Sequence, residues 1–351
     1  MSDKKENIQW LDTLRTLAIL GVVLIHISSP ITNTTFQNNV PYWWIGNILI
    51  SITRYAVPVF LLLSGATMLG REYNIKKFYR KRVVRVVVPF LFWLIVYFFF
   101  RYFTLPTQQP PPKGGSEILN WALDLFFNDG VSKHFWYIYM ILFIYILMPF
   151  LSKIARMLQG KYMVVFLVLW VIVAVWSTKY PANMHKFTDT NRLIKYFIYA
   201  GYLFVGFYLY KHIQVNTKMR LLSFVLFVIT VAVCALTVYF SSIGEKRPNQ
   251  SIYNYLSLNT ILQAVTLFIA IKDTSLKNKI TARINQEISN YSLGIYLAHI
   301  MVLGILYNHR IFWTMVHPLI SVPIVFVLTF SISYFIVFLL RKIPYGKYIA
   351  G

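Results

Sequence analysis

Apolar runs of about the length needed to cross a lipid bilayer follow one another along this chain, and they limit its fold more than any other feature. A hydrocarbon core of about 30 Å requires about 20 helical residues. Ten such runs lie at 11–30, 43–69, 86–104, 135–151, 162–178, 196–210, 221–241, 254–271, 291–307 and 318–340. Several of them, notably 135–151 and 196–210, are at the short end. Because a backbone in lipid must satisfy its own hydrogen bonds, we predict an all-α, polytopic transmembrane helix bundle of about ten spans.

The composition agrees with this interpretation. Of the 351 residues, 58% are hydrophobic and only 13% are charged, which is too apolar for a soluble globular protein. The net charge of +23 would suit nucleic acid, but no polar segment is long enough for a nucleic-acid-binding module, so we expect no nucleic-acid partner. The single cysteine, Cys234, excludes an intrachain disulfide and a cysteine-cluster metal site, and we expect no metal centre.

The charges of the loops predict how the chain crosses the membrane. Lys4 and Lys5 precede the first apolar run, but no small-residue cleavage site follows it, so we expect an uncleaved span rather than a signal peptide. With the N-terminus in the cytoplasm, the loops on that side carry more than twice as many Lys and Arg residues as the opposite loops. This bias is typical of cytoplasmic loops, and it predicts that both termini are cytoplasmic.

The longest connection on the opposite side covers 105–133. It begins with LPTQQPPPKGG, whose prolines and glycines favour an irregular chain, and continues with ILNWALDLFF, which can form a short amphipathic helix at the membrane surface. The sequence has no internal repeat, and we expect a single membrane-embedded domain over 1–351 with no appended soluble domain.

Three polar residues interrupt the first apolar run, LDTLRTLAILGVVLIH. Arg15 and His26 are separated by about three helical turns plus 20°, so they share one helix face, and Asp12 lies within about 40° of it. Along the helix axis, Arg15 is about 16 Å nearer the cytoplasm than His26. Ionisable groups within a span normally face the bundle interior or a wet cavity. The stripe therefore predicts a path through the membrane.

Four more polar residues fall within or beside apolar runs: Arg54, Ser64, His134 and His299. Any one of these residues alone is more often a structural residue that bonds to a neighbouring helix. Three polar residues on one face, together with these four, favour a functional site instead. The other histidines lie in or beside loops, where we expect them to be solvated: His185, His212, His309 and His317.

The pair Arg15 and His26, with ten residues between them, resembles the signature of the acyltransferase-3 family of bacterial integral-membrane O-acyltransferases. Further similarity is carried by VPVFLLLSG at 57–65, FYRKRVVRVVVPFLFW at 78–93, HFWYIYMILFIYILMPFL at 134–151 and YSLGIYLAHI at 291–300. The resemblance implies a multi-pass enzyme of the bacterial cytoplasmic (inner) membrane, in contact with membrane lipids. It also implies transfer of acetyl from cytoplasmic acetyl-CoA, as a cosubstrate, to a hydroxyl of a surface glycan or its lipid-linked precursor. No permanently bound cofactor is expected, and no oligomeric state is predicted.

Arg82 and Arg85 match the basic pair of this family and are expected to bind the donor. Seven Lys and Arg residues lie within 70–85, and anchoring at anionic lipid explains most of them. The pair can share a helix face at i and i+3, and guanidinium groups suit bidentate contact with the phosphates of CoA. Arg15 would then guide the thioester arm inward.

Acetyl transfer to an alcohol needs a base for the hydroxyl proton and a stabilising group for the carbonyl oxygen. His26 is the best candidate for the base, with Asp12 near enough to influence it. Arg54, Ser64 or His299 would stabilise the oxyanion or orient His26. His134 and His299 are the alternative bases, and a route through acetyl-His26 is the alternative to direct transfer.

Two rival functions remain. A transporter or export component for a polysaccharide would use the same polar stripe for conduction, although no paired broken helices or matching halves stand out. An acyltransferase with another donor, such as succinyl-CoA, would differ only modestly in chemistry. Assays of donor hydrolysis or transfer with purified protein separate these alternatives.

Overall fold

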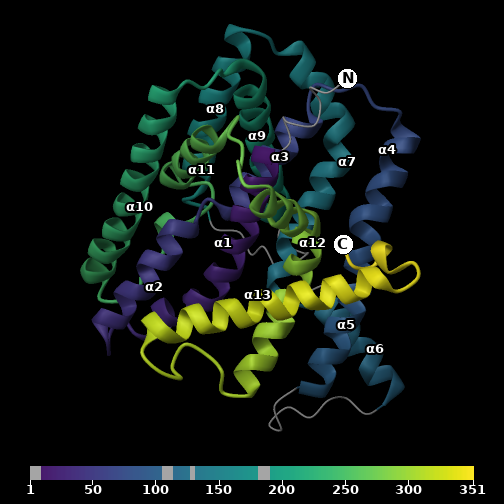
Figure 1. Ribbon diagram of the computed structural model, residues 1–351, viewed down its shortest axis with the longest axis vertical. Coiled ribbons are helices and arrows are strands. Elements are labelled where there is room, and N and C mark those ends of the chain that lie inside the picture. The colour runs from purple at the N-terminus through teal and green to yellow at the C-terminus, as the bar shows by residue number, and fades with distance from the viewer. Residues whose placement is uncertain (1–8, 105–113, 127–130, 181–189) are drawn as a thin grey trace.

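The computed structural model describes residues 9–104, 114–126, 131–180 and 190–351 (Figure 1). Within these ranges the chain forms helices and connecting turns and no strand, as predicted. The α-helices are α1 (Gln9–Thr34), α2 (Val40–Thr53), α3 (Ala56–Met68), α4 (Ile75–Arg82), α5 (Val88–Thr104), α6 (Gly115–Asp124), α7 (Trp136–Met157), α8 (Lys161–Ser177), α9 (Thr190–His212), α10 (Thr217–Glu245), α11 (Leu258–Ile271), α12 (Lys279–Asn308) and α13 (Pro318–Lys342). The π-helix η2 (Val83–Val87) and the short 3₁₀-helices η4 (Lys133–Phe135), η5 (Ser251–Tyr253) and η6 (Gly346–Tyr348) complete the described chain.

Eight helical segments among the described residues are long and apolar enough to span a membrane. They are Gln9–Thr34, Val40–Met68, Ile75–Thr104, Lys133–Met157, Asn191–His212, Thr217–Glu245, Lys279–Asn308 and Pro318–Lys342. The other two predicted spans are the shorter apolar helices α8, of 17 residues, and α11, of 14 residues. At about 1.5 Å per residue, α11 is too short to cross a core of about 30 Å by itself. The polytopic helical bundle is therefore confirmed, with eight candidate spans and two shorter apolar helices among the described residues.

The predicted span 43–69 consists of two helices. α2 ends at Thr53 and α3 begins at Ala56, so Arg54 and Tyr55 form the turn between them. Pro58 explains the break, because it has no N–H to donate to the carbonyl of Arg54. The sequence pattern is apolar on both sides of this turn, and hydropathy alone did not reveal it.

The basic stretch 70–85 is largely helical, whereas we expected a loop. The Asn74 side chain caps α4 by accepting a hydrogen bond from the Lys77 N–H at 3.0 Å. The chain then passes through η2, in which the Val88 N–H donates to the carbonyl of Val83, and enters α5 directly. Pro89 cannot donate to the carbonyl of Arg85, which accounts for the local change of helix type.

Part of the predicted external connection is also helical. α6 covers Gly115–Asp124, and none of its residues is buried, in agreement with a short helix at the membrane surface. The prediction for 105–113 and 127–130 falls outside the described residues, as do those for Lys4, Lys5 and His185.

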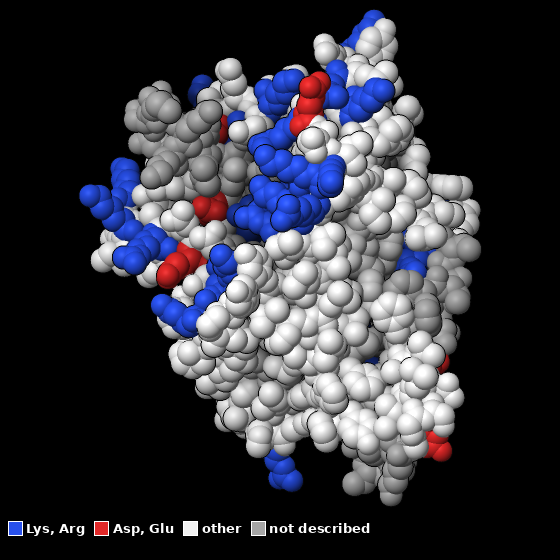
Figure 2. Space-filling view, turned by 90° about the vertical axis from the view of Figure 1, so that its right-hand side faces the viewer, with Lys and Arg blue, Asp and Glu red and all other residues white. Residues whose placement is uncertain are grey.

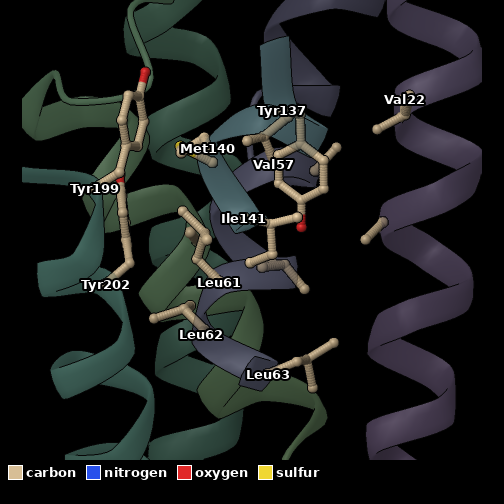
Figure 3. Packing of buried hydrophobic residues seen from close by; sticks show 14 of the residues in the cluster. Val22, Val57, Leu61, Leu62, Leu63, Tyr137, Met140, Ile141, Tyr199 and Tyr202 are labelled. Carbon is tan, nitrogen blue, oxygen red and sulfur yellow. The ribbon is translucent and has the colours of Figure 1, made fainter. Parts of the chain in front are cut away.

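α1 lies near the centre of the bundle, where it contacts α2, α3, α12 and α13 (Figure 1). α3 packs closely against α9. In Figure 3, Leu62 of α3 points toward the helix that carries Tyr202, whereas Leu63 points to the opposite side, toward α1. α3 thus packs between α9 and the central helix α1.

Small residues allow α3 and α9 to approach at backbone distance. A Cβ atom added at Gly65 would lie 1.9 Å from the carbonyl oxygen of Leu203, and one added at Gly206 would lie 2.0 Å from that of Leu62. Such contacts are typical of membrane helices, whose association depends on close packing rather than on exclusion of water.

Candidate active site

The polar stripe of α1 faces α12, and the two helices run in parallel. Arg15 Nη1 donates to Ser289 Oγ at 2.8 Å and to Asp12 Oδ1 at 3.1 Å, and Ser289 Oγ donates to Asp12 at 2.6 Å. Further along both helices, the His26 ring packs against that of His299 at a centroid distance of 5.1 Å. Asp12, Arg15 and His26 therefore share one face of α1, as expected, and this face packs against α12.

Three histidines meet at the end of the α1–α12 contact that is farther from Arg15. The His299 ring packs against His26 and, at 5.3 Å, against His134, which lies in η4. His134 and His299 are buried, whereas His26 is half-buried. The structure therefore brings together the predicted base and both alternative bases. In the part of the chain that the structure describes, no three His, Cys, Asp or Glu residues are arranged to hold a metal ion.

Hydrogen bonds fix the orientation of two of the rings. His299 Nδ1 lies 2.6 Å from the carbonyl oxygen of Tyr296, and since a carbonyl only accepts, Nδ1 carries the proton and a neutral ring has Nε2 free to accept one. His134 Nδ1 contacts Ser132 Oγ at 2.7 Å. The Nε2 atoms of both histidines are buried without a hydrogen-bond partner among the described residues.

A cavity of about 430 Å³ lies between α1, α3, α7, α12 and the α4–η2 segment. Its basic lining residues are Arg15, Arg71, Lys81, Arg82 and Arg85. The remaining lining residues are polar or apolar, and include Ser64, Thr67, Tyr137, Tyr145, Ser292 and Tyr296. Arg15 is 31% exposed through its side chain, so the salt bridge to Asp12 leaves part of its guanidinium open to this cavity. We call this space the first cavity.

The first cavity leads toward the histidines. Ser292 and Tyr296 line it and lie on α12 between Ser289, which is level with Arg15, and His299, which is level with His26. Tyr296 is one helical turn, about 4.5 Å of axial rise, short of His299. His26 itself does not line the first cavity. A basic chamber and the histidine cluster are therefore neighbouring but separate, with Tyr296 between them.

Arg82 and Arg85 both line the first cavity, although η2 replaces the regular helix that we expected between them. The Arg82 guanidinium lies 5.4 Å from the ring centroid of Phe78 and 5.2 Å from that of Tyr145, which holds it in place by cation–π contact. Arg85 is exposed. The basic pair and Arg15 thus reach one common space from different helices.

Two other predicted site residues, Arg54 and Ser64, form hydrogen bonds to groups outside the histidine cluster. Arg54 Nη1 donates to the carbonyl oxygen of Tyr253 at 3.1 Å, and its guanidinium lies 4.6 Å from the Tyr253 ring centroid, so it ties the α2–α3 turn to η5. Ser64 Oγ donates to the carbonyl of Phe60 on its own helix at 2.9 Å, and it lines the first cavity. Neither residue contacts the histidines through a hydrogen bond given by the structure.

The remaining described histidines lie at helix ends. His212 ends α9, His309 is an exposed residue directly after α12, and His317 caps α13. Their placement agrees with the expectation that they lie in or beside loops.

Sequence reasoning missed two residues that connect these parts. Ser289 joins Asp12 to Arg15, and Tyr296 lines the first cavity, accepts from His299 through its carbonyl, and donates its hydroxyl to the carbonyl of His134. The spacing of Tyr296 and His299, at i and i+3, was a usable signal for a shared helix face.

Comparison with known proteins places this chain in a family. Residues 8–338 match the family model for an acyltransferase domain, Acyl_transf_3. A search of curated proteins and a search of solved structures each gave no match. The matched range includes α1, the first cavity and all three clustered histidines. The chain therefore belongs to the acyltransferase-3 family, and it is a multi-pass membrane acyltransferase.

Proposed function

We propose that this protein transfers an acetyl group from cytoplasmic acetyl-CoA to a hydroxyl of a surface glycan or its lipid-linked precursor, in the bacterial cytoplasmic membrane. One observation carries the proposal: a chamber lined by five cationic side chains ends one helical turn from a cluster of three histidines. The cationic end suits a phosphate-bearing donor, and the histidines supply the proton acceptor that transfer needs.

The donor would enter with its thioester arm pointing toward Tyr296. Arg82 and Arg85 would bind phosphate oxygens in the first cavity, which Arg15, held by Asp12 and Ser289, also lines from α1. The mixture of hydroxyl and apolar groups beyond Arg15 is suitable for an uncharged pantetheine arm. The fixed salt bridge gives Arg15 a defined orientation before the donor arrives.

In the proposed reaction, His26 takes the proton of the acceptor hydroxyl while the hydroxyl oxygen attacks the thioester carbonyl. The new C–O bond forms, the C–S bond breaks, and the proton is passed to the departing CoA sulfur. His299 contacts the His26 ring and would orient it. Because His26 lies beyond the first cavity, Tyr296 and the neighbouring side chains must move before the thioester can reach it. The alternative route, in which His26 attacks the thioester and forms acetyl-histidine with release of CoA, requires the same movement.

The acceptor belongs on the opposite side of the membrane from the donor in this scheme. The sequence motifs are similar to those of the enterobacterial common antigen O-acetyltransferase, and we propose an acceptor of that chemical class. Succinyl-CoA is the alternative donor. A polysaccharide transporter is the alternative function from another class, and it would show no turnover of acyl-CoA.

The test uses purified protein in lipid nanodiscs and measures both CoA release from acetyl-CoA and acetyl-CoA binding. His26→Ala should reduce CoA release by about 10²–10⁴-fold, because positioned proton transfer typically contributes this much, while binding and thermal stability stay near those of wild type. Arg15→Ala should instead weaken acetyl-CoA binding. His309→Ala, at an exposed histidine after α12, is the matched control and should behave as wild type.

Two outcomes would contradict the proposal. If wild-type protein releases CoA from neither acetyl-CoA nor succinyl-CoA in the presence of lipid-linked glycan, the transporter alternative is favoured. If His26→Ala and Arg15→Ala remain active but unfold at lower temperature, the stripe is a polar packing network between α1 and α12.

A further inference from the structure

A second cavity of about 540 Å³ opens beside the first one, and its lining is dominated by cations. Its basic lining residues are Lys77, Arg80, Lys81, Arg85, Arg341 and Lys347. None of the described side chains that line it is acidic, and the carboxyl group of Gly351 lies at its edge, where it accepts a hydrogen bond from Arg341. Figure 2 shows a dense patch of Lys and Arg side chains on the face of the molecule where α4 and the C-terminal end lie in Figure 1. Six cationic side chains with no acidic side chain among them favour a ligand that carries several negative charges.

The C-terminal segment, residues 343–351, forms one wall of the second cavity and is firmly packed. Arg341 Nη2 donates to the carbonyl oxygen of Asn290 at 2.9 Å and to that of Gly351 at 2.5 Å. Ala350 is fully buried, and its carbonyl oxygen would lie 2.2 Å from a Cβ added at Gly294 of α12. These contacts hold the segment against α12, so the position of Lys347 is defined by the fold.

Lys347 is the available cation of this wall. Arg341 is engaged with two backbone carbonyls and lies 4.3 Å from the Tyr291 ring centroid. Lys347 is exposed and lines the second cavity, and its ammonium group lies 5.1 Å from the ring centroid of the neighbouring Tyr348 but makes no hydrogen bond or ion pair with a described residue. Both residues lie beyond 338, where the family match ends. A ligand role for Lys347 would therefore be a property of this chain rather than one carried by the matched domain.

The two cavities are adjacent, because Lys81 and Arg85 line both of them. A ligand held at these two residues can extend a long arm into the first cavity while a further charged group occupies the second. CoA has this form, with a diphosphate between its pantetheine arm and a nucleoside that carries a 3′-phosphate.

We infer that the second cavity binds the 3′-phosphate of the donor, with Lys347 as one of its ligands and with the diphosphate at Lys81 and Arg85. This inference rests on the proposed use of a CoA donor. A phosphate of an anionic lipid headgroup has the same chemistry, and basic residues near a membrane commonly meet such lipids. The nucleotide is favoured because the second cavity adjoins the first cavity, which lies between helices of the bundle, whereas the tails of a lipid must remain in the bilayer.

The experiment compares the binding of CoA and 3′-dephospho-CoA to wild-type protein and to Lys347→Gln, by calorimetry in nanodiscs of phosphatidylcholine. Lys342→Gln is the matched control, because this exposed residue ends α13 and lines neither cavity. Wild type should bind CoA about tenfold more tightly than 3′-dephospho-CoA, as expected for a lost charged hydrogen bond. Lys347→Gln should lose most of this tenfold preference and bind 3′-dephospho-CoA as wild type does, and Lys342→Gln should keep the preference.

The outcomes separate this inference from the proposed function. Equal binding of the two ligands by wild type, or equal weakening of both by Lys347→Gln, overturns the inference and leaves a CoA donor intact. Absence of CoA binding by wild type overturns both. A repeat in nanodiscs that contain phosphatidylglycerol tests the lipid source: if anionic lipid abolishes the preference of wild type for CoA, the second cavity holds a headgroup phosphate and the inference is wrong.

Discussion

His299 uses its two ring nitrogens differently. Nδ1 bonds to the Tyr296 carbonyl, while Nε2 has no hydrogen-bond partner among the described residues and belongs to a ring that packs on His26 and His134. A buried nitrogen without a partner is costly, and Nε2 is therefore the atom at which the proposed role of His299 beside His26 can be tested.

We expect the two amide substitutions at His299 to have different effects. The amide nitrogen of Asn can replace Nδ1 and keep the bond to Tyr296, whereas the amide group of Gln lies nearer to the position of Nε2. His299→Asn should reduce CoA release by about 10²-fold with little loss of thermal stability, and His299→Gln should keep more activity and shift the pH profile of the rate. Unchanged activity in the stable Asn variant would exclude a role for Nε2.

At the scale of single residues, the sequence predicted correctly which residues of one helix share a face. The spacing of Asp12, Arg15 and His26 is enough to place them on one face, and they contact α12 in that way. Their partners Ser289 and Tyr296 could not be identified by the same reasoning, because the periodicity of one helix does not show which other helix faces it.

Close helix packing makes specific demands on glycine at the contact between α3 and α9. Gly206→Ala places a methyl group 2.0 Å from the Leu62 carbonyl oxygen, so the helices must separate. We expect a loss of about 1–3 kcal/mol in the free energy of unfolding, measured as a lower midpoint of thermal unfolding in detergent. Gly244→Ala of α10 is the control, because its Cβ meets no described atom within 4 Å. Equal midpoints for the two variants would show that the α3–α9 contact tolerates separation.

At the scale of elements, hydropathy located the apolar runs but not the changes of helix type within them. The break at Arg54 and the π-turn at Val83–Val87 both precede a proline, Pro58 and Pro89. Their physical cause is the missing N–H of proline, which an average over 20 residues does not detect. The basic stretch 70–85 was misread as a loop because its charge obscured the cap at Asn74 and the helical continuity into α5.

The orientation of the whole molecule in the membrane remains a prediction from loop charge. It can be tested at the two ends of α10 with an impermeant thiol reagent, since the native Cys234 is buried. Gly244→Cys should be labelled in intact cells because it lies on the predicted external side. Gln214→Cys should be labelled only after the cells are permeabilised. The reverse pattern would mean that the basic cavities open away from cytoplasmic acetyl-CoA.

The whole molecule keeps its cationic chamber and its histidines at different levels of α12. If the cations hold the nucleotide as proposed, they contact a part of the donor that the reaction leaves unchanged. Acetyl-CoA and the CoA left after transfer would then be bound by the same phosphate contacts. Such uniform binding holds the product as tightly as the substrate, so it does not speed the release of CoA. Free CoA becomes a competitor for the next acetyl-CoA, and the ratio of the two in the cytoplasm, more than the amount of either, would set how fast the enzyme works.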